Sequence, residues 1–226
     1  MLLLAPVCVK MARMPDQTLT RSYRGVTADD RVSGRREALI DAALEVFAAE
    51  GWSALSARRV CEQAGLTRRY FYESFADVDA LLGAAFDRIT GAVTDAVQAA
   101  AVGGGGASRE ELVRRAVSAG LGVLASPPSN GLFLAASLTA GGALVAHRAR
   151  SIDDLATIVA AAVASQPDAR RVSADEARLT ARIAVSAILS IVDGWLTNEV
   201  KLTNEEVVSW SVTVAVGIID AVTTRH

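Results

Sequence analysis

Two short helical patterns that meet at Gly65 set narrow limits on the fold of this chain. Ser56 suits the N-cap of the first pattern, and Thr67 suits the N-cap of the second. Gly65 can adopt the left-handed conformation that a tight turn requires. In the second pattern Phe71 and Phe75 lie one helical turn apart on the same face. The apolar side of the first helix consists of Ala57, Val60, Cys61 and Ala64. Two helices joined by so short a turn predict a helix-turn-helix unit.

The second helix of such a unit presents its first residues to base edges in the major groove of DNA. Here those residues are Arg68, Arg69 and Tyr70, and an arginine can bond guanine O6 and N7 together. Backbone amides at the two helix starts suit phosphate oxygens. The pattern therefore predicts DNA binding through a set of polar and aromatic residues, namely Ser56, Arg58, Thr67, Arg68, Arg69, Tyr70 and Tyr72.

An amphipathic helix precedes this unit. Apolar residues recur at helical spacing between Ser33 and Gly51, which suit its N-cap and its end. Residues 1–32 show no periodicity and predict an extended or disordered arm. We therefore expect a DNA-binding domain over residues 33–76. Arginines in or near the arm could also enter a minor groove, namely Arg21, Arg24, Arg31, Arg35 and Arg36.

The run from Arg35 to about Leu82 resembles the N-terminal domain of the TetR family of bacterial transcriptional repressors. Four motifs carry the resemblance: Phe-Ala-Ala-Glu-Gly-Trp, Ser-Ala-Arg-Arg-Val-Cys-Glu-Gln-Ala-Gly-Leu-Thr, Phe-Tyr-Glu-Ser-Phe and Asp-Val-Asp-Ala-Leu-Leu. Beyond them, only the length and the helical layout match. The resemblance implies that Ser56, Arg58 and the segment 67–72 contact DNA, and that a ligand-binding and dimerisation bundle follows the DNA-binding domain.

The chain departs from the family's pattern at several positions that bear on DNA binding. Leu55 stands where the family often has Thr, Ser74 where it has His or Tyr, and Val78 where it has Lys. The last two positions commonly touch phosphates, which puts some backbone contacts in doubt. Arg69 and Tyr70 replace residues that are usually smaller, which suggests an unusual operator sequence.

The remaining chain, residues 77–226, predicts helices throughout. Asp77 and Ser108 suit N-caps, and Ser173 with Glu176 has the spacing of a capping box. Residues 207–216 also alternate as a strand would, but no partner strand is visible, which favours a helix. We expect an all-α fold of about nine helices, with those of the body over about 77–102, 108–125, 128–140, 143–165, 174–200 and 204–224.

The last two helices of this body are apolar on more than one face and therefore need burial. A four-helix contact with a second copy of the chain would supply it, and the expected dimer interface consists of Ile183, Ile188, Ile191, Trp195, Val207, Trp210, Val214 and Ile218. The body is rich in Ala, Val and Leu, which predicts a mainly aliphatic cavity for a small effector. Phe133 and His147 are the residues we expect to contact that effector.

Charge and cysteine content exclude some other classes. The net charge is −2, so the chain does not coat nucleic acid by bulk charge, although residues 1–75 carry net +2 and residues 76–226 net −4. Two cysteines provide neither a disulfide framework nor a metal cluster, and we expect no metal and no cofactor. Cys61 suits a small core position, with a redox sensor as the alternative. No uninterrupted apolar run reaches the ~20 residues of a membrane span, and the N-terminus lacks the charge pattern of a signal peptide, so we expect a cytoplasmic protein.

These features favour a ligand-responsive repressor that binds a palindromic operator as a homodimer and leaves DNA when a small, apolar effector binds. The two reading helices of such a dimer lie about 34–36 Å apart. The alternative is a helical enzyme or protein-interaction bundle that retains the helix-turn-helix only as a fold element. The absence of any Ser/His/Asp or Cys/His set in the sequence counts against an enzyme.

Overall fold

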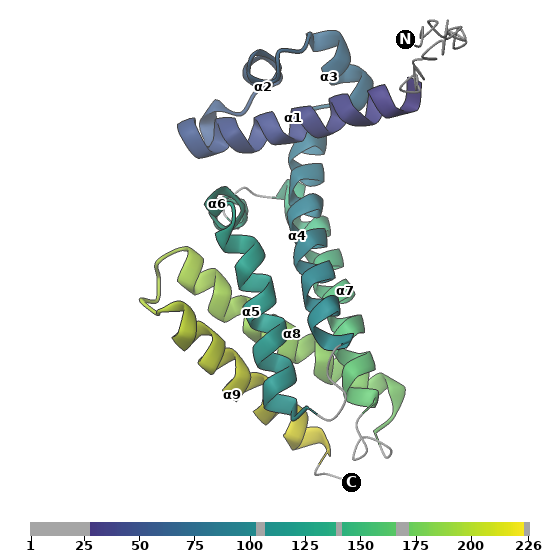
Figure 1. The fold of residues 1–226 in the computed structure, drawn as a ribbon, viewed down its shortest axis with the longest axis vertical. Helices are drawn as coiled ribbons and strands as arrows, with labels where there is room; N and C mark the ends of the chain where they lie inside the picture. The colour runs from purple at the N-terminus through teal and green to yellow at the C-terminus, as the bar shows by residue number, and fades with distance from the viewer. Residues whose placement is uncertain (1–27, 103–106, 139–141, 166–171, 224–226) are drawn as a thin grey trace, which may run out of the picture.

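A computed structural model describes residues 28–102, 107–138, 142–165 and 172–223, and every regular element within these ranges is helical. Nine α-helices and two 3-10 turns form a small head above a longer body (Figure 1). In the head, α1 lies across the top of the body, with α2 and α3 on its far side. The helix α4 runs from the head down into the body. The expected all-α fold of about nine helices is thus confirmed.

The head consists of α1 (Ala28–Glu50), a 3-10 turn (Trp52–Ala54), α2 (Ala57–Ala64) and α3 (Arg68–Ser74). Residues 28–32, which we expected in the arm, belong to α1. The helix continues through the expected N-cap Ser33 and through Gly34, and the acidic Asp30 near its start suits the helix dipole. The remaining part of the expected arm, residues 1–27, lies outside the described residues.

The turn between α2 and α3 forms as the sequence predicts. The Ser56 hydroxyl accepts a hydrogen bond from the Arg59 amide at 3.2 Å, and so caps α2. Gly65 ends α2 in the left-handed conformation, with φ of 64°. Thr67 has the extended backbone of an N-cap, but its side chain makes no capping hydrogen bond. The Thr67 hydroxyl is therefore not engaged in capping α3.

Six helices form the body. Asp77 accepts a hydrogen bond from the Ala80 amide at 2.8 Å, and Ser108 caps the next helix in the same way through the Glu111 amide at 3.2 Å. Ser173 and Glu176 form the expected capping box. The bounds of the body helices are α4 (Val78–Val102), α5 (Arg109–Ala125), α6 (Pro128–Ser137), α7 (Val145–Ala164), α8 (Ala174–Leu196) and α9 (Asn204–Thr223).

Two of these helices differ from expectation. The helix α8 ends at Leu196 rather than near residue 200, because Asn198 takes a left-handed conformation with φ of 58°. The alternating segment 207–216 is helical and belongs to α9. Its alternation reflects two apolar faces of a helix, of which only one is covered within the chain.

The head and the body meet at a cluster of three aromatic rings. Phe47 of α1 and Trp52 of the 3-10 turn both pack on Phe133 of α6, with ring centroids 5.4 and 5.5 Å apart. Phe47 and Trp52 also contact each other edge to face at 6.0 Å. Phe133 is fully buried. We call these three rings the junction cluster, and they fasten α1 to α6 at a point distinct from α4.

The helices α8 and α9 are, by length and composition alone, apolar enough to cross a membrane. This corrects the expectation that no segment reaches that length, because scattered Ser, Thr and Gly interrupt the apolar runs without making these helices polar. In the structure the two helices pack on each other and on α5 and α7. Only 28% of the apolar window of α8 and 33% of that of α9 is buried, so both helices keep apolar surface that the single chain does not fully cover.

Candidate DNA-binding surface and ligand cavity

The outer surface of α3 carries three exposed side chains that suit DNA. Arg68, Arg69 and Tyr72 all point away from the core of the head. The Arg69 guanidinium donates to the Glu73 carboxylate one turn later at 2.8 Å, and this pairing raises the pKa of Arg69. Arginine is charged at every relevant pH, so the pairing changes where the guanidinium lies rather than whether it is charged.

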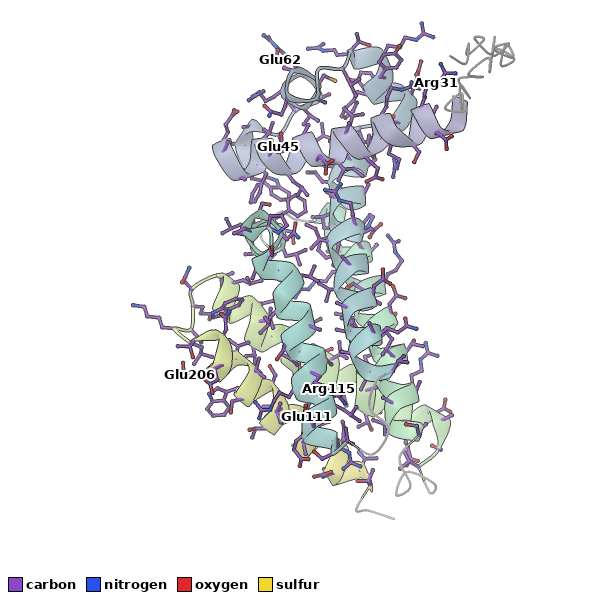
Figure 2. The ribbon with its side chains drawn as sticks, viewed as in Figure 1. Arg31, Glu45, Glu62, Glu111, Arg115 and Glu206 are labelled. Atoms are coloured by element: carbon purple, nitrogen blue, oxygen red, sulfur yellow. The ribbon has the colours of Figure 1, made fainter. Side chains whose placement is uncertain are left out.

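The exposed side of α2 repeats this arrangement. The Arg58 guanidinium donates to Glu62 at 2.8 Å, again one turn later. Figure 2 shows Glu62 on the upper surface of the head, on the side that faces away from the body. The hydrogen bond from Arg58 lowers the pKa of Glu62. Arg58 and Arg69, two of the three exposed arginines on these helices, are thus held by carboxylates that DNA phosphates would have to replace.

Two arginines of α1 support α3 from below. The Arg35 guanidinium lies over the Tyr70 ring, 4.5 Å from its centroid, and Arg36 lies over Phe75 at 4.3 Å. Arg36 also donates to the Ser74 carbonyl at 3.0 Å. Tyr70, predicted to face DNA, is half-buried, with its ring packed against Arg35. Of the arginines predicted for a minor groove, Arg35 and Arg36 have this supporting role, Arg31 is exposed on α1, and Arg21 and Arg24 lie outside the described residues.

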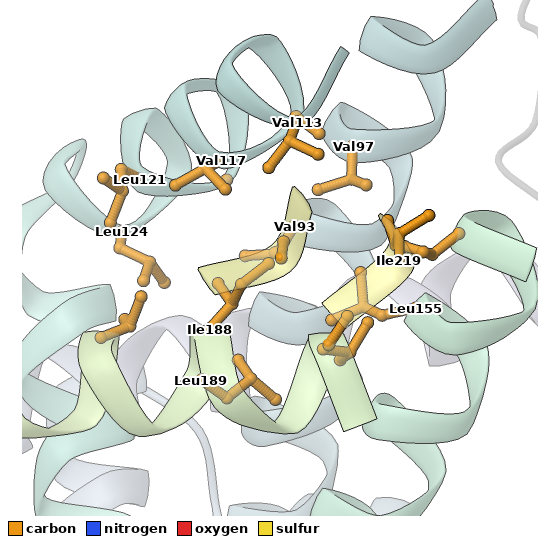
Figure 3. A pocket seen from close by; sticks show the side chains of 17 residues that line it. Val93, Val97, Val113, Val117, Leu121, Leu124, Leu155, Ile188, Leu189 and Ile219 are labelled. Carbon is orange, nitrogen blue, oxygen red and sulfur yellow. The ribbon is translucent and has the colours of Figure 1, made fainter. Parts of the chain in front are cut away.

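An apolar cavity lies in the body, between α4, α5, α7, α8 and α9 (Figure 3). Its volume is about 120 Å³, and its 17 lining residues are all aliphatic or glycine. Residues from Val93 on α4 to Ile219 on α9 contribute to the wall. A lining of this kind suits an apolar molecule, because it offers no partner to a buried polar group. The predicted aliphatic character of the interior agrees with this lining.

A second, smaller pocket of about 70 Å³ lies near the start of α5. Five residues line both pockets, namely Val97, Val113, Ala116, Val159 and Ile219. Arg109, the first residue of α5, is the one charged residue among those described on the wall of the second pocket. Its guanidinium forms an ion pair with the carboxylate of Asp220 on α9.

Neither residue predicted to contact an effector lines the apolar cavity. Phe133 belongs to the junction cluster between head and body. His147 lies instead on a polar groove between α4 and α7, near the head. The residues that line the cavity come from five helices that are distant in sequence, so no local pattern could have identified them.

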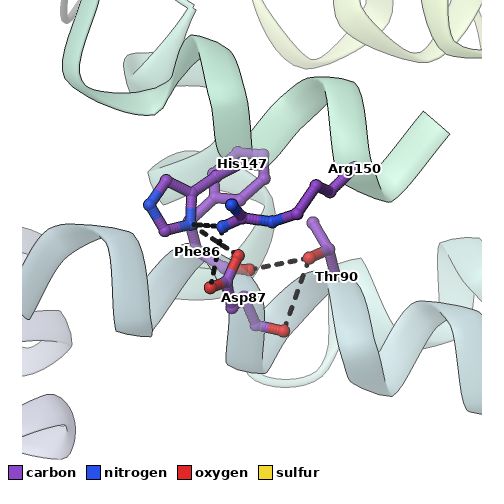
Figure 4. Close-up of polar contacts among 5 residues, drawn as sticks. All are labelled: Phe86, Asp87, Thr90, His147 and Arg150. Atoms are coloured by element: carbon purple, nitrogen blue, oxygen red, sulfur yellow. Dashed lines mark hydrogen bonds and ion pairs between the residues drawn. The ribbon is translucent and has the colours of Figure 1, made fainter. Parts of the chain in front are cut away.

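His147 forms a compact polar cluster with Asp87 and Arg150 (Figure 4). Its Nδ1 lies 2.7 Å from Asp87 Oδ1 and 2.9 Å from an Arg150 nitrogen. A protonated Nδ1 donates to Asp87, whereas an unprotonated Nδ1 accepts from Arg150. Phe86 packs against the imidazole ring at 6.4 Å between centroids. The cluster therefore links α4 to α7 just below the head.

The residues predicted at the dimer interface divide into three groups. Trp210 and Ile183 are 56% and 49% exposed on α9 and α8, and Trp210 shares a surface groove with Ile191 and Val214. Ile188 lines the apolar cavity, and Val207 is fully buried in the chain's own core. Val207 is thus unavailable to a partner, which corrects that prediction, because it lies on the inner side of α9. Trp195 and Ile218 are half-buried.

Cys61 lies in the core of the head and is almost fully buried. Burial raises the pKa of its thiol, which disfavours the reactive thiolate. Burial therefore favours a packing role for Cys61 in the core over a role as a redox sensor. In the described part of the chain, no group of three or more His, Cys, Asp or Glu side chains is arranged to hold a metal ion.

Residues 39–85 match the model of bacterial regulatory proteins, tetR family. Curated proteins give no match to the sequence.

Solved structures match over most of the chain. The fatty acid degradation regulator FadR from Bacillus halodurans has a TM-score of 0.64 at 16% identity, covering 80% of this chain and 94% of its own. FadR from Bacillus subtilis, in complex with stearoyl-CoA, has a TM-score of 0.62 at 18% identity, covering 81% and 97%. A TetR family transcription regulator from Marinobacter aquaeolei VT8 has a TM-score of 0.57 at 20% identity, covering 84% and 97%.

Proposed function

We propose that this chain, which carries the N-terminal domain of the tetR family and has the fold of its regulators, is a ligand-responsive transcriptional repressor of the cytoplasm. It binds a palindromic operator as a homodimer and is released from DNA by a small, apolar effector. The observation that carries the proposal is the pairing of an exposed arginine-bearing α3 with an apolar cavity in the body, connected by the single helix α4. No catalytic step is part of this function.

The head is built to hold α3 firmly. Arg59 pairs with Glu50 at 2.6 Å and so ties α2 to the end of α1, while Arg35 and Arg36 support α3. This leaves Arg68, Arg69 and Tyr72 on the outer surface, together with Ser56, Arg58 and Thr67 at its edge. Arg68 and Arg69 read base edges, and the others contact the DNA backbone. Tyr70 positions α3 through its contact with Arg35.

The helix α4 connects the ligand to the DNA. Its first half packs against α1, where Arg88 donates to Asp41 at 2.7 Å and approaches Glu37 at 3.4 Å. Its second half supplies Val93 and Val97 to the cavity wall. An effector that fits the cavity better when α4 is tilted shifts the protein towards that tilt, by at most the difference in its affinity for the two states. The tilt changes the spacing of the two reading helices in the dimer.

The uncovered faces of α8 and α9 supply the dimer contact. Exposed apolar side chains on both helices, among them Leu179, Ile183 and Trp210, require a partner to leave water. A second copy of the same two helices makes a four-helix contact with twofold symmetry. The acyl ligand of FadR from Bacillus subtilis supports an apolar effector for this chain.

A fluorescence-anisotropy titration against DNA from upstream of the chain's own gene tests the proposal. The salt concentration is fixed at about 0.15 M, because phosphate contacts make affinity salt-dependent. We expect nanomolar binding that a scrambled duplex abolishes. Arg69→Ala should weaken the free energy of operator binding by about 1–3 kcal/mol and relax the sequence preference. Arg114→Ala, an exposed arginine on α5, is the control and should bind normally.

Two results would count against the proposal. If Arg69→Ala leaves both affinity and sequence preference unchanged, α3 is not the reading surface. If no operator is found by selection from genomic DNA, the head serves only as a fold element. The alternative, a helical enzyme or protein-interaction bundle that does not bind DNA, would then be preferred.

A further inference from the structure

The wall of the apolar cavity offers no partner to a polar atom. All 17 lining residues are aliphatic or glycine, so the wall has no side-chain nitrogen or oxygen (Figure 3). Each of them lies within an α-helix, and all except Leu124 lie outside the first and last turns, where backbone N–H and C=O groups bond to each other. The Leu124 carbonyl is covered by Gly131 of α6, on which a β-carbon would lie 3.0 Å from its oxygen. Neither side chains nor backbone therefore bind a polar group in the cavity.

The buried polar side chains of the described residues leave this wall unchanged. They are Ser137, Thr180 and Ser211, and none of them lines the cavity. Each hydroxyl donates to a carbonyl of its own helix, at 2.6, 2.7 and 2.7 Å. Arg109, on the wall of the second pocket, forms its ion pair with Asp220 and is not on the wall of this cavity. A polar group brought into the cavity would thus stay without a partner.

The cavity is small as well as apolar. Its volume of about 120 Å³ is close to that of an engineered cavity of about 150 Å³, lined by similar side chains, that binds benzene. Figure 3 shows the side chains of four ribbon segments pointing inward around this space. The space therefore suits a compact molecule about the size of a single six-membered ring.

We propose that the cavity takes a small hydrocarbon as its effector, a molecule without any charged or hydrogen-bonding group. The inference rests on the proposed function, because it names the chemical class of the effector. Filling the cavity removes apolar surface from water and adds contacts with the aliphatic wall, and both effects favour binding. A hydroxyl or an amine would lose its hydrogen bonds to water and gain none in the cavity. The wall thus selects a ligand by rejecting polar groups.

Toluene, phenol and aniline test this selection, because each consists of the same ring with one further heavy atom. They differ in whether that atom is carbon, oxygen or nitrogen. Titration of the full chain at neutral pH, followed by NMR of its valine and leucine methyl groups, measures each affinity without DNA and shows which methyls respond. We expect toluene to bind at least about tenfold more tightly than phenol or aniline. The largest changes should fall on wall residues such as Val93 and Leu155.

Two glycines of α5 provide a variant and its matched control. A β-carbon on Gly120 would lie 3.4 Å from Val93 Cγ1 and 3.7 Å from Val97 Cγ2, two side chains of the wall. Gly120→Ala therefore adds a methyl group to the wall at ordinary contact distance. It should weaken toluene binding at least about threefold, because less space remains for the ring. Gly122→Ala adds a methyl group to the same helix where no atom lies within 4 Å, and should leave toluene binding unchanged.

Three binding results would overturn the inference. Phenol or aniline that binds as tightly as toluene would show that the site has a partner for a polar group. A toluene affinity that Gly120→Ala leaves unchanged would place the ligand outside the cavity. Binding of none of the three would make the cavity a packing void. The comparison of the three ligands needs no substitution, so it remains informative even if a variant fails to fold.

The operator titration separates these results from the proposed function. Toluene should release operator DNA, whereas phenol at the same concentration should not. Selective toluene binding by a chain that binds no operator would reject the proposed function and leave the ligand class of the cavity intact. Operator binding that toluene does not weaken, although toluene occupies the cavity, would show that a hydrocarbon is not the effector and would overturn the inference.

Discussion

The imidazole of His147 lies so close to Gly83 that a β-carbon on this glycine would be 2.6 Å from the ring atoms Cε1 and Nε2. Gly83 is buried in the first third of α4, and His147 is in the first turn of α7. The histidine cannot move freely away, because Asp87 and Arg150 both contact its Nδ1. The contact of α4 with α7 at His147 thus depends on the absence of a side chain at residue 83.

Gly83→Ala should therefore destabilise the fold, although alanine favours helices. Displacing the imidazole should lower the free energy of unfolding by about 1–3 kcal/mol, as measured by urea denaturation. Gly91→Ala is the matched control on the same helix, because an added β-carbon there meets no atom within 4 Å. That control should raise the free energy of unfolding by about 0.5–1 kcal/mol. The double variant Gly83→Ala, His147→Ala should recover much of the loss, and a failure to do so would assign the strain to another contact.

Glu73→Gln should strengthen DNA binding. The Glu73 carboxylate holds Arg69 at 2.8 Å and adds a negative charge to the surface that meets phosphates. Because exposed ion pairs contribute at most about 1 kcal/mol, the expected gain in affinity is at most about fivefold, and anisotropy titration would detect it. Glu205→Gln on α9, far from the head, should have no effect. A loss of affinity for Glu73→Gln would mean instead that the pair orients Arg69 for DNA.

The sequence predicts the parts of this structure that local chemistry controls. Ser56, Ser108 and Ser173 were recognisable as caps, because a cap depends on residues within one helical turn. Gly65 was recognisable as a turn because few other residues accept its conformation. The approach of His147 to Gly83 gave no such signal, since the two residues lie on different helices and each taken alone looks ordinary.

The same distinction applies to the candidate site. Arg68 and Arg69 were predicted because the position of a residue within a helix-turn-helix determines its exposure. The cavity and the position of Arg109 depend on how five helices pack, and helical periodicity says only which face is apolar. Val207 shows the limit clearly. The helix α9 has apolar residues on more than one face, and only the structure shows which of them face the chain's own core.

Trp210→Glu should dissociate the homodimer that we propose. Because Trp210 is largely exposed in the single chain, the change should leave the stability of the monomer nearly unaffected, within about 0.5 kcal/mol. A buried glutamate at a twofold contact is costly, so sedimentation equilibrium should show a monomer. Leu132→Glu alters an equally exposed residue on α6 and should remain dimeric. If Trp210→Glu sediments as a dimer, the interface lies elsewhere.

Asp193 and Glu206 should respond to acid in opposite directions. Burial raises the pKa of Asp193 above its ordinary 3.8, against the opposing effect of Arg148. The folded state therefore takes up this proton before the unfolded state does, and its uptake adds stability as the pH falls towards 3.8. The Thr203 amide and hydroxyl lower the pKa of Glu206 below 4.5, so the stability from this group is present above pH 4.5 and is lost as the pH falls from 4.5 towards that lower pKa.

Urea denaturation between neutral pH and about pH 3.5 measures both effects against neutral variants. The stability of the natural chain relative to Asp193→Asn should improve as the pH falls. Relative to Glu206→Gln, it should decline over the same range. If the stability of the natural chain relative to both variants changed with pH in the same direction, the pKa shifts given to these two groups would be wrong.

The junction cluster has a mechanical consequence. A rigid head joined to the body only through α4 could rotate about any axis through that connection. Phe133 adds a second attachment, through its contacts with Phe47 and Trp52, beside the packing of α1 on α4. A movement of α4 alone therefore cannot reorient α3 without also shifting or breaking the contacts among the three rings.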